Sequence, residues 1–250
     1  MKKRQGLASM LAIYRRELLS YLTTPTAYVF VAVFLFAIGL FTFQEGVFFD
    51  ERRADLSMFF GVHPWLYIVF LPAIAMRLWA EESRSGALEL LLTLPAPTWA
   101  LVVGKFLAAW SMAGAALVLT VPLWISVNVL GSPDNAAIFT AYLASLLMAG
   151  AYIAVGSALS ALTQAQIVAF VVSVLVCFVI TALGLPLVLD FFAGWAGGAV
   201  SEALARFSIL HHFDAAQRGV VEFRSLVYFV SLIALCLGLT VLAVDARRGG

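Results

Sequence analysis

Six apolar stretches, each long enough to cross a bilayer, constrain this chain more than any other feature. They cover residues 26–43, 56–78, 106–130, 136–162, 167–189 and 226–244. A helix needs roughly 20 mainly apolar residues to cross the hydrocarbon core of a membrane. Only 12% of the residues are charged, against about 25% in a soluble domain, so the chain cannot cover a water-facing surface. The sequence therefore predicts an all-α, polytopic membrane protein with six transmembrane helices.

Lysine and arginine are unequally divided between the two sides that this topology creates. Ten of them precede the first stretch, lie at the end of the second or between the second and third, or follow the sixth. The five on the other side are Arg52, Arg53, Arg206, Arg218 and Arg224. Loops on the cytoplasmic side of a membrane carry the excess of basic residues. Both termini, and the connection between the second and third stretches, are therefore expected in the cytoplasm.

Three segments outside the six stretches also have apolar character. Residues 7–22 repeat apolar side chains every three or four positions, and Arg15 and Arg16 lie beside them, as in a helix in the headgroup plane. Residues 183–200 are broken by Pro186 and by glycines, which indicates a re-entrant segment buried in protein. Residues 201–223 are amphipathic and are expected to form external helices.

Residues 80–106, AEESRSGALELLLTLPAPTWALVVGKF, are neither apolar enough to span nor polar enough for a simple loop. Their polar positions make one stripe on a helix. These positions are Glu82, Ser85, Gly86, Glu89 and Thr93. We expect one interfacial helix over residues 82–94, a continuous rod about 20 Å long, ended by Pro95 and Pro97. From spacing alone, a lever between two spans and a simple interfacial anchor are equally good explanations.

No pattern for catalysis or nucleotide binding is found in the sequence. A phosphate-binding loop needs G-x-x-x-x-G-K-[ST], but Gly104–Lys105 is followed by Phe106 and has Trp99 at the position of the first glycine. Charged side chains, which mark ion and proton routes, are almost absent from the spans. We expect no enzymatic activity, no cofactor and, at a net charge of +1, no nucleic-acid partner.

Several residues have a structural and a functional interpretation. His63, His211 and His212 are weak metal candidates, for which hydrogen-bonded structural roles are favoured. Cys177 and Cys236 lie in apolar runs and are expected to be small packing residues. Small residues at helix-packing spacing in 148–162 indicate close packing within the chain, with a dimer seam as the alternative.

Residues 77–110, RLWAEESRSGALELLLTLPAPTWALVVGKFLAAW, closely resemble the cytoplasmic segment after the second span in ABC type-2 exporter permeases. The marks of that segment are an acidic pair, a basic-small-Gly turn, an LELLLTLP run and a Gly-Lys-Phe that opens the third span. Here they are Glu81–Glu82, Arg84–Ser85–Gly86, residues 88–95 and Gly104–Phe106. Residues 209–240 are similar to the C-terminal part of gliding-motility permeases and of the permease of nitrous-oxide-reductase maturation.

The resemblance implies one permease domain over residues 1–250, with residues 1–24 as a connecting helix and 25–250 as a six-span bundle. Residues 82–94 would be the coupling helix, and 190–222 the external cap. The residues that would meet a separate ATPase are Glu81, Glu82, Arg84, Ser85, Gly86, Leu88 and Glu89, together with Arg15, Arg16 and Glu17 of the connecting helix.

The resemblance also implies partners and a location. A homodimer of ATPase subunits would bind ATP and Mg²⁺, and a second copy of this chain or a related permease would complete the complex in a bacterial inner membrane. The expected function is export driven by ATP hydrolysis. The alternative is a membrane scaffold whose ATPase drives a conformational change in an accessory protein with a large external domain.

Overall fold

The computed structural model describes residues 2–44, 56–93, 96–220 and 222–248, which are helical and contain no strand. Arg52, Arg53, Leu94 and Pro95, to which the sequence assigned roles, lie outside these residues. The helices are α1 (Lys2–Thr23), α2 (Pro25–Gln44), α4 (Ser57–Ala75), α5 (Ala80–Ser85), α6 (Ala87–Thr93), α7 (Thr98–Val118), α8 (Val121–Leu130), α9 (Asn135–Leu162), α10 (Gln166–Ala182), α11 (Pro186–Ala196), α12 (Gly198–Phe207), α13 (Ile209–Gln217) and α14 (Phe223–Arg248).

Several of the described helices are long and apolar enough to cross a membrane, as expected for a multi-pass protein. Four segments are long and apolar enough to span: α4 with α5, α7 with α8, α9, and α14. The number rises to six if two bent pairs each count as one span, α1 with α2 at 70° and α10 with α11 at 69°. The third span begins at Thr98, eight residues before the predicted start, because residues 98–105 continue the helix that packs against α1.

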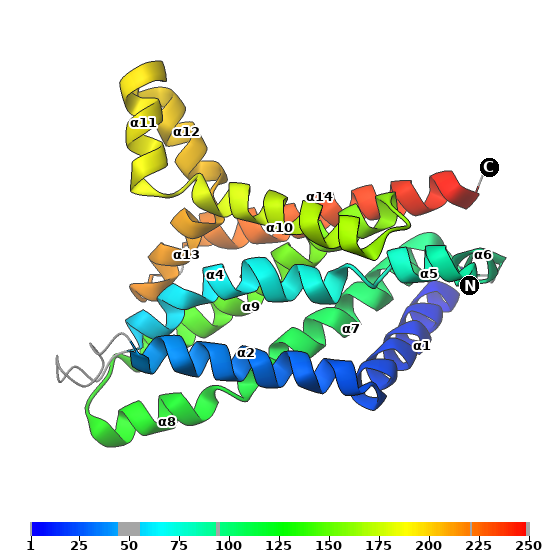
Figure 1. Cartoon of the computed structure of the whole chain (residues 1–250), viewed down its shortest axis with the longest axis horizontal. Helices are drawn as coiled ribbons and strands as arrows, with labels where there is room; N and C mark the ends of the chain where they lie inside the picture. The colour runs from blue at the N-terminus through cyan, green and yellow to red at the C-terminus, as the bar shows by residue number, and fades with distance from the viewer. Residues whose placement is uncertain (1, 45–55, 94–95, 221, 249–250) are drawn as a thin grey trace.

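α9 lies at the centre of the bundle and packs against α4, α7, α10 and α14 (Figure 1). Its small residues allow this close approach. A Cβ added at Gly150 would come 3.0 Å from Ile233 Cδ1 of α14, and one added at Gly156 would come 2.5 Å from Ala75 Cβ of α4. The prediction that these small residues pack within the chain is therefore confirmed.

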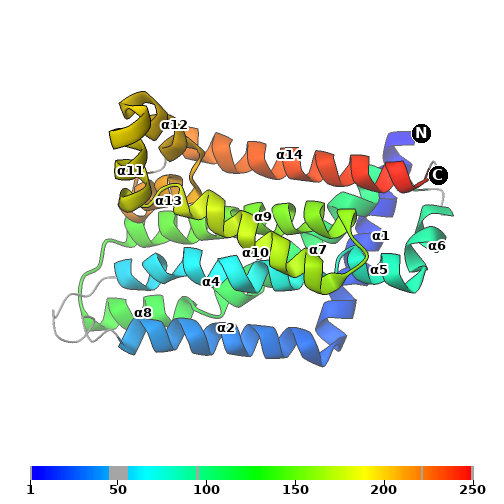
Figure 2. The same cartoon turned by 45° about the horizontal axis from the view of Figure 1, so that its top comes forward.

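α1 lies across one end of the bundle, at a steep angle to the helices that run along it (Figure 2). It packs against α7, where Gly104 permits contact: an added Cβ would come 3.0 Å from the Met10 carbonyl oxygen. Leu7 and Leu11 are exposed on its other side, as an interfacial helix requires. At the bend into α2, the Thr24 hydroxyl donates a hydrogen bond to the Ser20 carbonyl at 2.6 Å.

The segment predicted to be re-entrant does bend sharply at Pro186, but it is not buried in protein. α11 and α12 form a hairpin that projects from the bundle (Figure 1). Leu187 is 81% exposed and Trp195 80%, and α12 has no buried residue. α11 and α12 pack against each other, and a large apolar face of the hairpin remains exposed.

The two ends of the bundle carry different elements. Both termini, α1, α5 and α6 lie at one end, which we call the termini end (Figures 1 and 2). α8, α11, α12 and α13 lie at the opposite end, which we call the far end. The segments to which the sequence assigned ATPase contact are thus gathered at the termini end.

Candidate functional site

The predicted coupling segment is two short helices rather than one rod. α5 ends at Ser85 and α6 begins at Ala87, and between them Gly86 has a φ of 74°. A glycine in this left-handed conformation commonly ends a helix, because a Cβ there would be strained. The prediction of one continuous helix over residues 82–94 is therefore wrong, and Gly86 is a corner of the segment rather than part of a helical stripe.

Four charged side chains join α5 to α1 and α7. We call Arg16, Glu17, Glu82 and Lys105 the charged cluster. Lys105 Nζ lies 2.6 Å from Glu82 Oε1 and 3.3 Å from Glu17 Oε1, and Arg16 Nη2 lies 2.6 Å from Glu17 Oε1 and 3.6 Å from Glu82 Oε1. The Lys105 side chain is only 3% exposed, so it depends on these two carboxylates for its stability. The cluster brings Arg16, Glu17 and Glu82 together, as three of the predicted site residues.

α9 holds the start of α5 from the other side. The backbone N–H groups of Trp79 and Ala80 donate to Ser160 Oγ at 3.3 and 3.1 Å, and Ser160 Oγ donates to the Met76 carbonyl at 2.8 Å. The Trp79 indole donates to Ser157 Oγ at 3.0 Å. Because these groups are buried, their hydrogen bonds fix the turn between α4 and α5 against the centre of the bundle.

The outer face of α5 and α6 carries the other predicted residues. Arg84, Ser85, Gly86 and Glu89 are exposed, and Leu90 is 72% exposed. Leu88 is buried together with Leu91, and it therefore belongs to the core rather than to this face. Glu81 pairs with Arg77 at 2.8 Å in a half-exposed ion pair, and Arg15 is exposed on α1. We call Arg84, Ser85, Gly86, Glu89 and Leu90 the outer face.

The comparison with known families decides the classification of this chain. A family described as ABC-2 family transporter protein matches residues 11–247, from the first half of α1 almost to the end of α14. The chain belongs to the ABC-2 transporter family. A search of curated proteins found no match. Membership makes the chain a multi-pass permease component of an ABC system, whereas the resemblance to the gliding-motility branch stays a prediction.

The histidines of this permease have protein partners. His63 Nδ1 donates to the Phe59 carbonyl at 2.8 Å, and aromatic rings surround the imidazole. His212 Nε2 donates to the Arg206 carbonyl at 3.0 Å, and its Nδ1 lies 3.0 Å from Ser225 Oγ. Burial lowers the pKa of His212, and the Arg206 carbonyl opposes this. His211 lies beside His212 with its ring at 73° to it.

Possible metal ligands and the two cysteines were compared in the same way. No three His, Cys, Asp or Glu side chains in the described ranges gather closely enough to hold a metal ion. Burial raises the pKa of Asp214, the carboxylate nearest in sequence to the histidine pair, while Arg218 and His211 oppose this. Cys177 and Cys236 are free and buried, as expected for packing residues.

Sequence reasoning missed the residues of the permease that hold the predicted site in place. The sequence marks Lys105 only as one of the cytoplasmic basic residues and as part of a Gly-Lys-Phe motif, yet it is the centre of the charged cluster. Ser160 counted only among the small residues of 148–162, and Ser157 was not singled out. Their spacing of three places both hydroxyls on one side of α9, which is a sequence pattern for a polar contact in an otherwise apolar helix. The sequence did not indicate the partner of that contact.

Proposed function

We propose that this permease couples ATP hydrolysis by a separate ATPase subunit to the export of a substrate across the bacterial inner membrane. The observation that supports this most is the charged cluster, because the buried Lys105 of α7 pairs with Glu82 of α5 and with Glu17 of α1. A displacement of α5 therefore cannot be absorbed locally. It must move α1 and α7, or break ion pairs whose charges are shielded from water.

The outer face is the proposed contact with the ATPase, and the termini end of the bundle is the proposed cytoplasmic end. Leu90 and Glu89 project from α6, whereas Leu88 and Leu91 anchor the same helix to the permease. Arg15, exposed on α1, would extend the contact. An exposed leucine among charged residues matches the apolar centre and polar rim of protein interfaces. The proposed assembly has two ATPase subunits, which hold ATP and Mg²⁺, and two permeases.

Co-purification with the cognate ATPase tests this contact. We expect Glu89→Arg combined with Leu90→Arg to release the ATPase while the permease remains folded, because both side chains are exposed and Glu89 pairs with no cation among the described residues. Glu202→Arg on α12 is the control, since it reverses an exposed glutamate at the far end and loses only a solvent-exposed ion pair with Arg206. If the double variant retains the ATPase with unchanged hydrolysis, the outer face is not the contact.

The alternative function, a membrane scaffold that acts on an external partner, has its own supporting observation. The α11–α12 hairpin projects from the far end and exposes apolar side chains, including Phe191 and Trp195. Such a surface suits an accessory protein with a large external domain. Deletion of residues 187–206 separates the two functions: the scaffold predicts loss of that partner with ATPase binding intact, whereas export alone predicts no partner to lose.

A further inference from the structure

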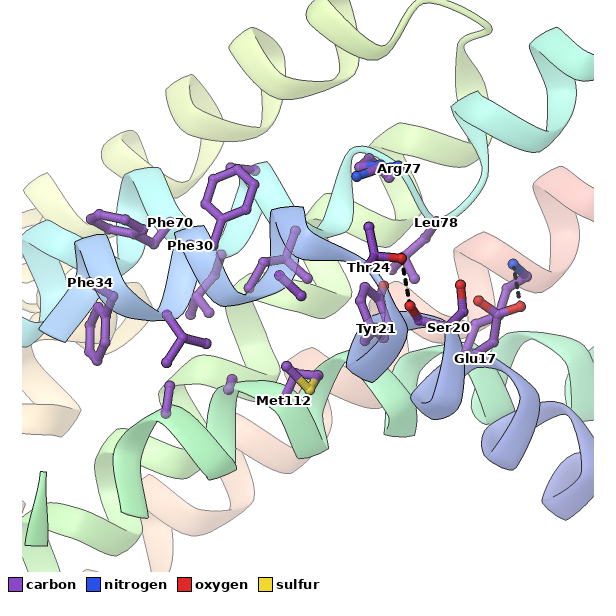
Figure 3. Close-up of a pocket in the computed structure, with 18 of the residues that line it drawn as sticks. Glu17, Ser20, Tyr21, Thr24, Phe30, Phe34, Phe70, Arg77, Leu78 and Met112 are labelled. Carbon is purple, nitrogen blue, oxygen red and sulfur yellow. Dashed lines mark hydrogen bonds and ion pairs between the residues drawn. The ribbon is translucent and has the colours of Figure 1, made fainter. Parts of the chain in front are cut away.

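A cavity of about 490 Å³ lies at the termini end, under the bend between α1 and α2, and is also lined by residues of α4, α5 and α7. Pockets that hold small organic ligands have volumes of about 300–1,000 Å³. The lining of the cavity changes from polar to apolar along its length, as Figure 3 shows. Glu17, Ser20, Tyr21 and Arg77 gather toward one end, and aromatic side chains lie toward the other.

The apolar part of the cavity has the depth of one membrane leaflet. Its inner limit is formed by Phe34, Tyr67 and Leu71, which are 5%, 3% and 3% exposed. Tyr67 and Arg77 are ten residues apart in and just after α4, which corresponds to about 15 Å. This is about half of the ~30 Å hydrocarbon thickness. An acyl chain can therefore lie in the cavity while its headgroup stays at the level of the charged cluster.

The polar end of the cavity has balanced charge and one unsatisfied acceptor. The lining contains three cations and three glutamates: Arg16, Arg77 and Lys105 with Glu17, Glu81 and Glu82. The net charge of a charged headgroup would therefore have no counter-charge in the cavity. Glu82 uses Oε1 for Lys105, but its Oε2 is buried and has no hydrogen-bond partner among the described residues. A buried carboxylate oxygen without a partner is costly, and a donor from a ligand relieves that cost.

Arg77 supplies the complementary group. Its Nε and Nη2 donate to Glu81 at 2.8 and 3.3 Å, whereas Nη1 makes no hydrogen bond within the described part of the chain. Arg77 projects at the polar end of the cavity (Figure 3). A guanidinium with a free N–H group is a good partner for a phosphate oxygen. The cavity thus offers an acceptor for an ammonium group and a donor for a phosphate.

We propose that this cavity binds one aminophospholipid, an amphiphile with a primary ammonium and a phosphate in its head and an acyl chain as its tail. The ammonium donates to Glu82 Oε2, the phosphate accepts from Arg77, and an acyl chain lies against Phe34 and Tyr67. A quaternary ammonium has no N–H group for Glu82, and a headgroup without an amine leaves the phosphate charge unbalanced. Neither ATPase coupling nor export is needed for this binding.

Native mass spectrometry of the purified full-length permease in detergent tests the proposal. Phosphatidylethanolamine, phosphatidylcholine and phosphatidylglycerol with identical dioleoyl chains are titrated separately. We expect one phosphatidylethanolamine to be retained about tenfold more tightly than either of the others, the effect of one charge-assisted hydrogen bond. Glu82→Gln should reduce this preference to the level of phosphatidylcholine. Equal retention of the three lipids would overturn the proposal.

Matched tryptophan substitutions on α7 locate the bound lipid. Ala113 lines the cavity, so Ala113→Trp should fill it and abolish retention of phosphatidylethanolamine. Val118, on the same helix, is 66% exposed and does not line the cavity, so Val118→Trp should keep wild-type retention. Equal retention by both variants would place the lipid elsewhere and refute the site.

A measurement on the unmodified chain makes the proposal independent of folding in the variants. Phosphatidylethanolamine with a photoreactive acyl chain should crosslink to the α2 and α4 residues around Phe34 and Phe70 in vesicles of phosphatidylethanolamine and phosphatidylglycerol. Crosslinks spread evenly over the lipid-facing helices would contradict it. The ATPase is absent from all three measurements, so failure here leaves the proposed coupling standing, and failure of the co-purification test leaves the lipid site standing.

Discussion

Replacement of Lys105 by methionine removes the buried cation that lies between two largely buried carboxylates, and leaves only the exposed Arg16 near them. Methionine keeps the length and most of the volume of the side chain, so packing around it is little changed. Glu82 and Glu17, with side chains 16% and 15% exposed, would lose their contacts at 2.6 and 3.3 Å. Removal of one partner from a buried ion pair costs about 3–5 kcal/mol, because the remaining charge is left in a poorly solvated site. Glu17 keeps Arg16, so we expect the lower part of this range.

Equilibrium unfolding in mixed micelles, with helix content as the readout, measures this loss. The control is Arg206→Met, which breaks the Arg206–Glu202 pair on α12, where the two side chains are 51% and 65% exposed. An exposed pair contributes only about 0–1 kcal/mol. The double variant Glu82→Gln with Lys105→Met should recover much of the stability, since it removes both charges of the Lys105–Glu82 pair.

Two results would refute the reasoning. The free energy of unfolding of Lys105→Met could lie within about 1 kcal/mol of the wild-type value, which is the effect expected from the loss of a solvent-exposed ion pair. The double variant could also be less stable than Lys105→Met, which would show that Glu82 stabilises the fold without its cation. In either case the charged cluster would not hold α5 rigidly to α1 and α7.

Three further predictions concern packing, hydrogen bonding and pH. Gly156→Ala should destabilise by about 1–3 kcal/mol because its Cβ meets α4 at 2.5 Å, whereas Gly39→Ala, with no neighbour within 4 Å, should be neutral in the same unfolding assay. Ser160→Ala should cost about 1–3 kcal/mol, since two buried backbone N–H groups at the start of α5 lose their acceptor, while Ser126→Ala on exposed α8 should not. Burial lowers the pKa of His212, so the unfolded chain binds a proton at this residue more readily than the folded chain does. The melting temperature should therefore be highest above about pH 6.5 and fall as the pH decreases below that value. The variant His212→Gln should show a smaller fall.

The sequence by itself determined the environment of this protein, its family and the segments that meet at the termini end. Lipid cannot satisfy backbone polar groups, so long apolar stretches with few charges must become helices, and composition gives their approximate positions. The helix α1 was predictable because its apolar side chains recur at helical spacing. Gly86 was also readable in principle: a glycine after a short polar helix is a common C-terminal cap.

Only the tertiary structure decided which way the side chains of those segments face. Glu82 and Glu89 lie on the same predicted stripe, yet Glu82 pairs with Lys105 inside the protein and Glu89 is exposed. The corner at Gly86 rotates α6 relative to α5, and the partner of Glu82 comes from α7, 23 residues along the chain. The cavity likewise depends on the 70° bend between α1 and α2 and on where α4 and α7 pass it. Local spacing describes one helix at a time, whereas charge pairing and cavities depend on the relative placement of several helices.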